Sequence, residues 1–147
     1  MIEIRHFFPG EKNSFKEHLK VFIDLPLKLY SDFTQYVHPL YVSMKEMLGG
    51  KYPFHKHSEC HYFLAYRNGK AVGRIAAIIN NNHIKFSGRK EGFFGFFDCI
   101  DDEDVARKLF EAVEGILSQK GVQAIKGPAN FSTNESCGCL VLGFEYP

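Results

Sequence analysis

The fold of this chain is decided by residues 60–101, which contain the run CHYFLAYRNGKAVGRIAAII at positions 60–79 and the run EGFFGFFDCID at positions 91–101. In the first run, two apolar segments lie on either side of Asn68-Gly69, a dipeptide that tolerates positive φ at both positions of a tight turn. It predicts a β-hairpin in which residues 62–66 pair antiparallel with residues 72–78. The second run predicts a third strand over residues 92–100, which completes an antiparallel meander. Such apolar strands need helices on both faces of the sheet.

The residues before the hairpin predict one edge strand and two helices. Residues 2–6 alternate between apolar and polar side chains, which is typical of a short strand at the edge of the meander. Asn13 or Ser14 is placed to cap a first helix, and Pro26 is expected to end or kink it. A second helix is expected from Pro39 through residue 47, before a pair of glycines.

The residues after the meander predict a return to the sheet. The acidic residues 101–104 suit the positive end of a helix, and Gly121 is a typical terminator for it. Residues 122–125 then predict a short strand that this helix brings back parallel to its neighbour. The capping-box pattern over residues 132–135 predicts a last short helix that includes residues 139–142.

Composition limits the class of protein. The chain has 147 residues, of which 45% are hydrophobic and 15% aromatic, so residues 1–147 suit one folded domain. A formal net charge of +1 gives no overall attraction to nucleic acid or to an anionic membrane, and neither partner is expected. No apolar run reaches the roughly 20 residues that span a bilayer. Four cysteines with irregular spacing do not form a secreted disulfide framework, so a cytoplasmic location is expected.

One cluster of side chains has metal-binding chemistry. His55, His57, Cys60 and His61 lie close together in the sequence, and imidazole with thiolate suits zinc. Their spacing matches no standard zinc motif, and a surface loop that enters a strand explains them equally well. The expectation is therefore no metal, with a metal-dependent function left as an alternative. Cys99 follows an aspartate and precedes others, which should raise its pKa and make it a poor nucleophile.

The element order and several local sequences resemble the GNAT superfamily of acyltransferases. The segments are Phe-Leu-Ala and Val-Gly-Arg-Ile-Ala-Ala-Ile in the hairpin, Gly-Phe-Phe-Gly-Phe-Phe at 92–97, and Lys-Gly-Pro-Ala-Asn-Phe-Ser-Thr-Asn-Glu at 126–135. They are similar to those of a group of bacterial GNAT-like proteins, and the likeness covers nearly the whole chain. The resemblance implies a mixed α/β (α+β) sheet, the GNAT-like acyl-CoA N-acyltransferase fold. It also implies that residues 1–147 are the N-terminal portion of that fold, without its last two strands.

The resemblance implies acetyl-CoA or another acyl-CoA as cofactor, but one element departs from the superfamily pattern. Active members usually hold the pyrophosphate of coenzyme A on a glycine-rich loop at a helix N-terminus. This chain has the acidic residues 101–104 at that place. Neighbouring like charges about 4 Å apart repel by about 1 to 4 kcal/mol. The pyrophosphate loop is therefore expected to be degenerate, and the affinity of this chain alone for CoA to be weak.

The resemblance leads to two hypotheses about function. The first is an acyl-CoA-dependent N-acyltransferase that modifies a small-molecule amine. In it the backbone of Gly95, Phe96, Phe97 and Asp98 binds the acyl carbonyl, and Asp98 or Glu135 is the general base. The simpler interpretations are that Asp98 is a strand-end residue facing water and that Glu135 belongs to the capping box. The alternative function is a GNAT-shaped binding or interaction module without catalysis.

The expected shape of the sheet also bears on assembly. Without two final strands, the short strand over residues 122–125 would have an unpaired edge, and edges of this kind favour association. We therefore expect a homo-oligomer in which this edge, or the neighbouring residues 140–142, contacts a second copy.

Overall fold

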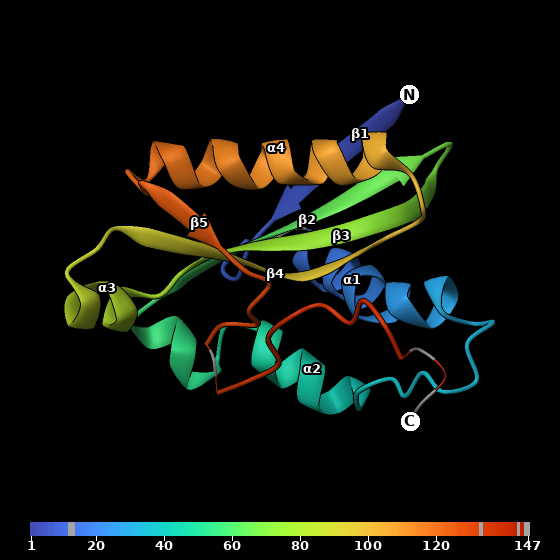
Figure 1. Ribbon diagram of the computed structural model, residues 1–147, viewed down its shortest axis with the longest axis horizontal. Coiled ribbons are helices and arrows are strands. Elements are labelled where there is room, and N and C mark those ends of the chain that lie inside the picture. Colours follow the sequence, from blue (N-terminus) through green and yellow to red (C-terminus); the bar gives the residue numbers. More distant parts are fainter. Residues whose placement is uncertain (12–13, 133, 144, 146–147) are drawn as a thin grey trace.

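The computed structural model describes residues 1–11, 14–132, 134–143 and 145, and it forms one mixed α/β unit (Figure 1). A five-stranded sheet has the strand order β1-β2-β3-β4-β5 and carries helices on both faces. The elements are β1 (Ile2–Phe7), α1 (Phe15–Leu29), α2 (Tyr41–Leu48), the 3-10 helix η1 (Pro53–Lys56), β2 (Glu59–Arg67), β3 (Lys70–Ile79), α3 (Asn81–Ser87), β4 (Glu91–Cys99), α4 (Glu103–Gln119) and β5 (Ala124–Lys126).

The predicted hairpin is confirmed. β2 and β3 pair antiparallel, and the turn between them places Asn68 at φ 50° and Gly69 at φ 76°. Positive φ at both positions is the geometry that Asn-Gly favours, because its backbone twist matches that of the paired strands. The turn therefore sets the register of the central pair.

The rest of the sheet grows outward from this pair. β1 joins the free edge of β2, at an edge of the meander as predicted, and β4 pairs antiparallel with β3 as predicted; the β1–β2 pair is also antiparallel. α4 then crosses one face of the sheet, and β5 returns parallel to β4 with pairs from Glu91↔Ala124 to Phe93↔Lys126. The mixed sheet thus follows from the lengths of its connections, because a hairpin turn reverses the chain and a helical crossover does not.

Two hydrophobic cores lie on opposite faces of the sheet. On one face α4 buries Val105, Leu109, Val113 and Leu117, whose spacing forms a single helical stripe, against β2 and β3. On the other face α1, α2 and η1 cover a larger core that is rich in aromatic rings (Figure 1). Its fully buried members include Phe7, Phe22, Ile23, Leu48, Tyr62, Leu64, Ile78 and Phe131. This second face also carries the site described below.

Helix α1 differs from the prediction at Pro26, because the helix continues through the proline to Leu29. Proline has no N–H to donate to the carbonyl four residues earlier, which belongs to Phe22. That carbonyl is instead bound by Arg74 Nη1 at 2.5 Å. A side chain from β3 thus replaces the missing helical hydrogen bond.

Two further predictions need correction, and one helix was missed. Helix α2 begins at Tyr41 rather than at Pro39, and α3 occupies residues 81–87, for which no helix is predicted from the sequence. The prediction of a last helix that includes residues 139–142 is wrong. These four residues are not helical, and all four are exposed. The pattern at Ser132 and Glu135 closes a turn instead, in which Glu135 N donates to Ser132 O. Asn13 lies outside the described residues, and Ser14 precedes α1 without a side-chain cap.

Glu91 ties the start of β4 to its neighbours. Its carboxylate lies 2.9 Å from Lys126 Nζ of β5 and 2.9 Å from His83 Nε2 of α3. The hydrogen bonds from Lys126 and His83 lower the pKa of Glu91 to about 2. The cluster therefore holds α3 and β5 on either side of the same strand end.

We expect this cluster to make stability depend on acid. Because the pKa of Glu91 is lowered on folding, its contribution is present above the unfolded value near 4.5 and is lost as the pH falls towards 2. The free energy of unfolding of the Glu91→Gln variant, measured by urea denaturation, should therefore fall less steeply than that of the wild type over this range. Equal slopes for the two proteins would contradict the assignment.

In the described part of the chain, no helix combines the length and the apolar character needed to span a membrane.

Candidate active site

A cavity of about 840 Å³ opens beside β4 on the face that carries α1 and α2. Tyr30 and Tyr36 contribute to one wall, and residues 96–98 of β4 form the floor. The opposite wall comes from the segment after β5 and includes Pro128 and Leu140. The cavity therefore lies where three segments, distant in sequence, meet.

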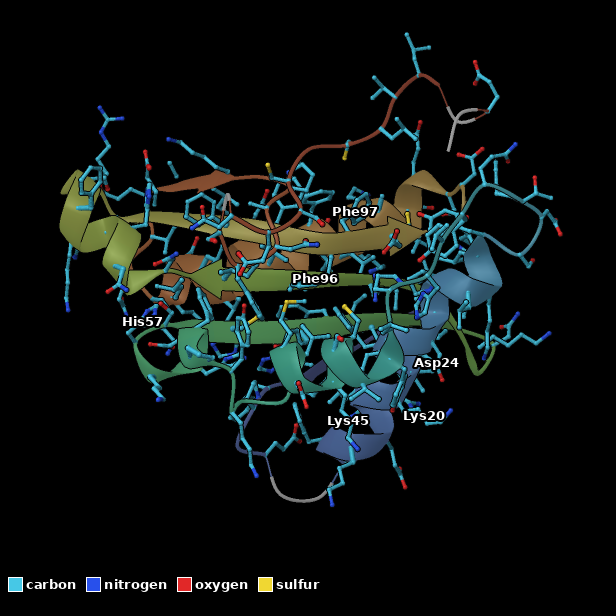
Figure 2. All side chains as sticks on the ribbon, turned by 90° about the horizontal axis from the view of Figure 1, so that it is seen from below. Lys20, Asp24, Lys45, His57, Phe96 and Phe97 are labelled. Atoms are coloured by element: carbon cyan, nitrogen blue, oxygen red, sulfur yellow. The ribbon has the colours of Figure 1, made fainter. Side chains whose placement is uncertain are left out.

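The floor of the cavity contains a β-bulge. Gly95 pairs with Ala76 and Asp98 pairs with Arg74, so two residues of β4 lie opposite the single residue Ile75. Phe96 has a φ of 50°, which is uncommon for a residue other than glycine. Figure 2 shows Phe96 and Phe97 near the middle of the sheet. A bulge leaves one residue outside the regular ladder and turns the strand locally, which is a frequent arrangement beside active sites.

The regular ladder between β4 and β5 ends next to the bulge. Their pairing ends at Phe93 and Lys126, after which Ala129 N donates to Phe94 O at 2.8 Å. Phe96 N donates to the side-chain Oδ1 of Asn130 at 2.8 Å. The segment that follows β5 therefore stays beside β4 through single hydrogen bonds rather than a continuous ladder, and this leaves room for the cavity.

The glycines of β4 allow a close approach to the strand backbone, and this approach is made by the protein itself. A Cβ on Gly95 would collide with the backbone of Ala129, and a Cβ on Gly92 would lie 3.1 Å from Leu117 of α4. The glycines thus let neighbouring segments pack closely. Phe96, Phe97 and Asp98 line the cavity, whereas Gly95 supports its edge.

Asp98 is held by two hydrogen bonds at the end of the floor. Its Oδ1 accepts from the Tyr30 hydroxyl at 2.6 Å, and its Oδ2 accepts from Arg74 Nε at 2.8 Å. The side chain of Asp98 is 17% exposed and that of Arg74 is 9% exposed. Burial and the bond to Asp98 raise the pKa of Tyr30 well above its ordinary value. The simpler interpretation of Asp98 as a strand-end residue facing water is therefore wrong.

A second polar pair, Tyr36 and His38, lies at the wall of the cavity that contains Tyr30 and Tyr36. The Tyr36 hydroxyl is 3.2 Å from His38 Nδ1, and the rings of Tyr30 and Tyr36 are 4.8 Å apart. Burial lowers the pKa of His38, and the positive charge of Arg74 lowers it further. His38 therefore favours the neutral imidazole at neutral pH.

Comparison with solved structures shows the same architecture. An aminoglycoside acetyltransferase from an uncultured soil metagenomic sample, crystallised with sisomicin, aligns with a TM-score of 0.60 at 15% identity over 88% of this chain and 78% of its own. A GNAT-family acetyltransferase from Staphylococcus aureus MU50 aligns with a TM-score of 0.54 at 18% identity over 85% and 71%. This chain has the GNAT fold.

Curated proteins give closer sequence relatives of this GNAT-like chain. Protein YghO of Escherichia coli strain K12 is 37% identical over 132 residues, which are 90% of this chain and 34% of the relative. Bacterial ceramide synthase of Caulobacter vibrioides is 40% identical over 131 residues, which are 88% of this chain and 34% of the relative. The chain thus spans about a third of the length of these curated relatives. No family model matches the chain.

The second carboxylate predicted for the GNAT site lies away from the first. Glu135 accepts hydrogen bonds from the Ser132 hydroxyl and, at 3.3 Å, from the Tyr52 hydroxyl. Asp98 lines the cavity, whereas Glu135 is not among its described lining residues. The structure therefore does not bring the two predicted acid-base residues together.

The N-terminus of α4, where GNAT enzymes usually hold pyrophosphate, is occupied by the chain's own carboxylate. Asp102 accepts a hydrogen bond from Val105 N at 3.1 Å and pairs with Arg67 at 2.8 Å. These contacts, first the bond from Arg67, lower the pKa of Asp102. Asp102 is thus an ionised cap on the N-terminus of α4.

The side chains considered for metal binding, which include His55, His57 and Cys60, have different partners in the structure. His55 Nε2 lies 3.0 Å from Met47 O, and His57 Nδ1 lies 2.7 Å from Ser58 Oγ. Cys60 is buried, and burial raises its pKa. Among the described residues, no three histidine, cysteine, aspartate or glutamate side chains are grouped so that they could hold a metal ion. Burial also raises the pKa of Cys99, in the direction predicted for it.

Several residues at the cavity were missed by sequence reasoning. Arg74 entered the sequence analysis only as part of the Val-Gly-Arg-Ile segment. Asn130 entered it only as part of residues 126–135, which resemble GNAT-like proteins. Tyr30 directly follows the last residue of α1, and Tyr36 lies further along the same connection. No sequence motif distinguishes either residue. The one available signal was Pro26, which leaves a carbonyl of α1 without its helical donor and so calls for a donor from elsewhere.

Proposed function

We propose that this chain is the GNAT part of an acyl-CoA-dependent N-acyltransferase. The observation that carries the proposal is the bulge at Phe96, which forms the floor of a cavity close to the point where the ladder between β4 and β5 ends. The structural neighbours named above are acetyltransferases, and one is an aminoglycoside acetyltransferase. A curated relative is named a ceramide synthase, and ceramide is an N-acylated lipid amine. These names agree on transfer of an acyl group to a small-molecule acceptor.

In this proposal the residues of β4 bind the acyl thioester. The backbone from Gly95 to Asp98 holds the acyl carbonyl beside the bulge, where one residue lies outside the regular ladder, although the amide of Phe96 itself already donates to Asn130 Oδ1. Asp98 and Glu135 remain predictions as general base. Asp98 is the better placed of the two, since it lines the cavity.

The cavity favours an apolar acyl chain over an acetyl group. Its walls include the apolar side chains of Phe33, Val37, Leu140 and Leu142 together with the phenylalanines of the bulge. Each methylene removed from water contributes about 0.8 kcal/mol, so binding should strengthen as the acyl chain lengthens. The name of the ceramide synthase relative is consistent with such a donor.

One observation favours the alternative, a GNAT-shaped binding module without catalysis. The carboxylate of Asp102 caps α4 where pyrophosphate usually binds, and Asp101, Glu103 and Asp104 surround it. With the pyrophosphate loop degenerate in this way, acyl-CoA would have to be held mainly through its acyl and pantetheine parts. The proposed homo-oligomer would then depend on the exposed residues 140–142 or on the edge of β5.

Calorimetry with acetyl-CoA and octanoyl-CoA on the full-length protein tests the apolar cavity. We expect octanoyl-CoA to bind more tightly than acetyl-CoA. The Val37→Asp variant should remove that preference, because this exposed side chain lines the cavity and its charge would face the acyl chain. Val42→Asp is the matched control, since Val42 is also exposed and is not among the lining residues.

Release of free thiol in the presence of a lipid amine or an aminoglycoside then tests transfer. Thiol release that needs the amine supports the N-acyltransferase. Binding of acyl-CoA without any amine-dependent release would favour the non-catalytic module, and equal affinity for the two acyl-CoAs would contradict the apolar acyl site.

A further inference from the structure

Tyr36 and His38 form the second polar pair at the cavity, and we infer that they are the proton acceptor for the attacking amine. The inference rests on the proposed N-acyltransferase function. Transfer of an acyl group to an amine requires that the nitrogen lose a proton. A group at the cavity with a free acceptor position must take it.

Asp98 and Tyr30 are engaged with each other and with Arg74. Each carboxylate oxygen of Asp98 accepts a hydrogen bond, one from Arg74 and one from Tyr30, which holds the carboxylate in place although each oxygen keeps a further lone pair. The hydroxyl of Tyr30 is turned towards Asp98, and its raised pKa keeps the proton in place. These residues therefore form a fixed support for the floor of the cavity.

Tyr36 has the position that the step requires. Its side chain lines the cavity, and its hydroxyl lies 3.2 Å from His38 Nδ1, within reach of a hydrogen bond. Burial raises the pKa of Tyr36, so the phenol stays protonated and passes a proton on rather than ionising. His38 is not among the described lining residues, so it acts through Tyr36.

His38 has the protonation state of an acceptor. Arg74 of β3 lowers its pKa, whereas Asp24 of α1 and Asp98 of β4 act in the opposite direction, and burial outweighs both carboxylates. Its Nε2 is buried and has no hydrogen-bond partner among the described residues. A buried imidazole nitrogen without a partner calls for an explanation, and a catalytic role is one of those known for such groups. With the hydrogen on Nε2, Nδ1 is free to accept from Tyr36.

The chemical step balances as follows. The amine nitrogen forms a bond to the acyl carbon, and the π electrons of the carbonyl move to its oxygen, while the amine proton passes to the Tyr36 oxygen and the hydroxyl proton of Tyr36 passes to His38 Nδ1. The carbonyl bond then re-forms as the carbon–sulfur bond breaks, and the thiolate takes a proton from water. The imidazolium returns its proton to water, which restores neutral His38 and leaves an amide and a free thiol.

The first test does not depend on activity. Long-range nitrogen–proton correlation spectra of the full-length protein with isotope-labelled histidine report which ring nitrogen carries hydrogen. We expect His38 to be neutral at neutral pH with hydrogen on Nε2, and to titrate below the ordinary value of about 6.5. Hydrogen on Nδ1, or a charged ring at neutral pH, would overturn the relay whether or not the protein transfers an acyl group.

The second test measures amine-dependent thiol release from octanoyl-CoA between about pH 5 and 9, a range that covers the titration of histidine. The wild-type rate should fall on the acid side with the pKa of His38, because the imidazolium accepts no proton. The rate of the His38→Gln variant should be lower by about 100-fold or more. Its rate should also no longer show the fall at low pH that the wild type shows, here called the acid limb. Tyr36→Phe should lose as much, and the double variant no more than either, because the two residues act as one unit.

Tyr41→Phe is the matched control, since Tyr41 carries an equivalent hydroxyl and is not among the lining residues of the cavity. A His38→Gln protein that keeps both its rate and its acid limb would refute the relay while leaving the proposed function intact. If the wild type releases no thiol, the proposed function fails, and the spectra alone then decide whether the pair has the inferred protonation state.

Discussion

Replacing Arg74 by methionine should destabilise the protein by about 3 to 5 kcal/mol, the cost of breaking a buried ion pair by removing one partner. The substitution leaves the carboxylate of Asp98 without its charged neighbour in a place that is largely closed to water. It also leaves the carbonyl of Phe22 without a donor, because Pro26 cannot supply one. The guanidinium further lies 5.0 Å from the centre of the Phe22 ring, and that contact is lost too.

Urea denaturation of the wild type and of three variants checks this expectation. Arg107→Met is the matched control, because Arg107 pairs with Asp104 and Glu111 on the exposed side of α4 and should matter far less. The double variant Arg74→Met with Asp98→Asn should recover part of the loss, since the unpaired charge is then gone. If Arg74→Met costs no more than Arg107→Met, the pair does not support the cavity floor as described.

The central part of the fold was predictable because its signals are local. Asn68-Gly69 fixes a turn whatever surrounds it, and the apolar runs on each side specify which residues pair. The stripe of α4 is equally local, since Val105, Leu109, Val113 and Leu117 are spaced to form one face of a helix. In both cases, residues close together in the sequence are sufficient to specify the local structure.

Helix α3 was missed because it has no apolar stripe. None of its residues is buried, so the hydrophobic periodicity that indicates a helix is absent. Its ends do carry signals: Asn80 accepts a hydrogen bond from His83 N, and Gly88 ends the helix at φ 69°. For a helix this short, the cap residues were better evidence than periodicity.

The prediction of a final helix was wrong because it used only the local capping-box pattern. It took no account of the contacts that this segment makes in the folded chain. The segments 128–132 and 134–138 approach each other, with Ala129 bridged to Cys137 and Gly138 N donating to Pro128 O. This local pairing satisfies backbone groups that a helix would otherwise have used. The pattern at Ser132 and Glu135 suits either arrangement, so the pattern by itself did not decide between them.

The candidate site was predictable only in part. The glycines and phenylalanines of β4 identified its floor, but the bulge shifts the register, and only this shift places Arg74 opposite Asp98. Tyr30 reaches Asp98 across a separation of 68 residues, and no local pattern specifies such a contact. The polar network therefore depends on the packing of α1 against the sheet.

Phe131 connects the segment after β5 to the larger core. Its side chain is 1% exposed and stacks on Phe54 with ring centroids 4.4 Å apart and planes inclined by 7°. It also meets the ring of Phe96 edge-on at 5.4 Å, and its carbonyl accepts from Asn80 Nδ2 at 3.4 Å. Its φ of 67° shows that the backbone bends sharply here to bring the ring into the core.

Phe131→Ala should therefore cost about 3 to 5 kcal/mol of stability, the usual loss when a buried phenylalanine leaves a cavity. Alanine disfavours the positive φ as phenylalanine does, so no relief of backbone strain offsets the loss. The same change should weaken binding of octanoyl-CoA, because the segment that forms one wall of the cavity loses its anchor. Urea denaturation and calorimetry measure the two effects, with Phe86→Ala as the matched control on an exposed ring. A loss of stability without any change in octanoyl-CoA affinity would show that the segment after β5 does not form a wall of the acyl site.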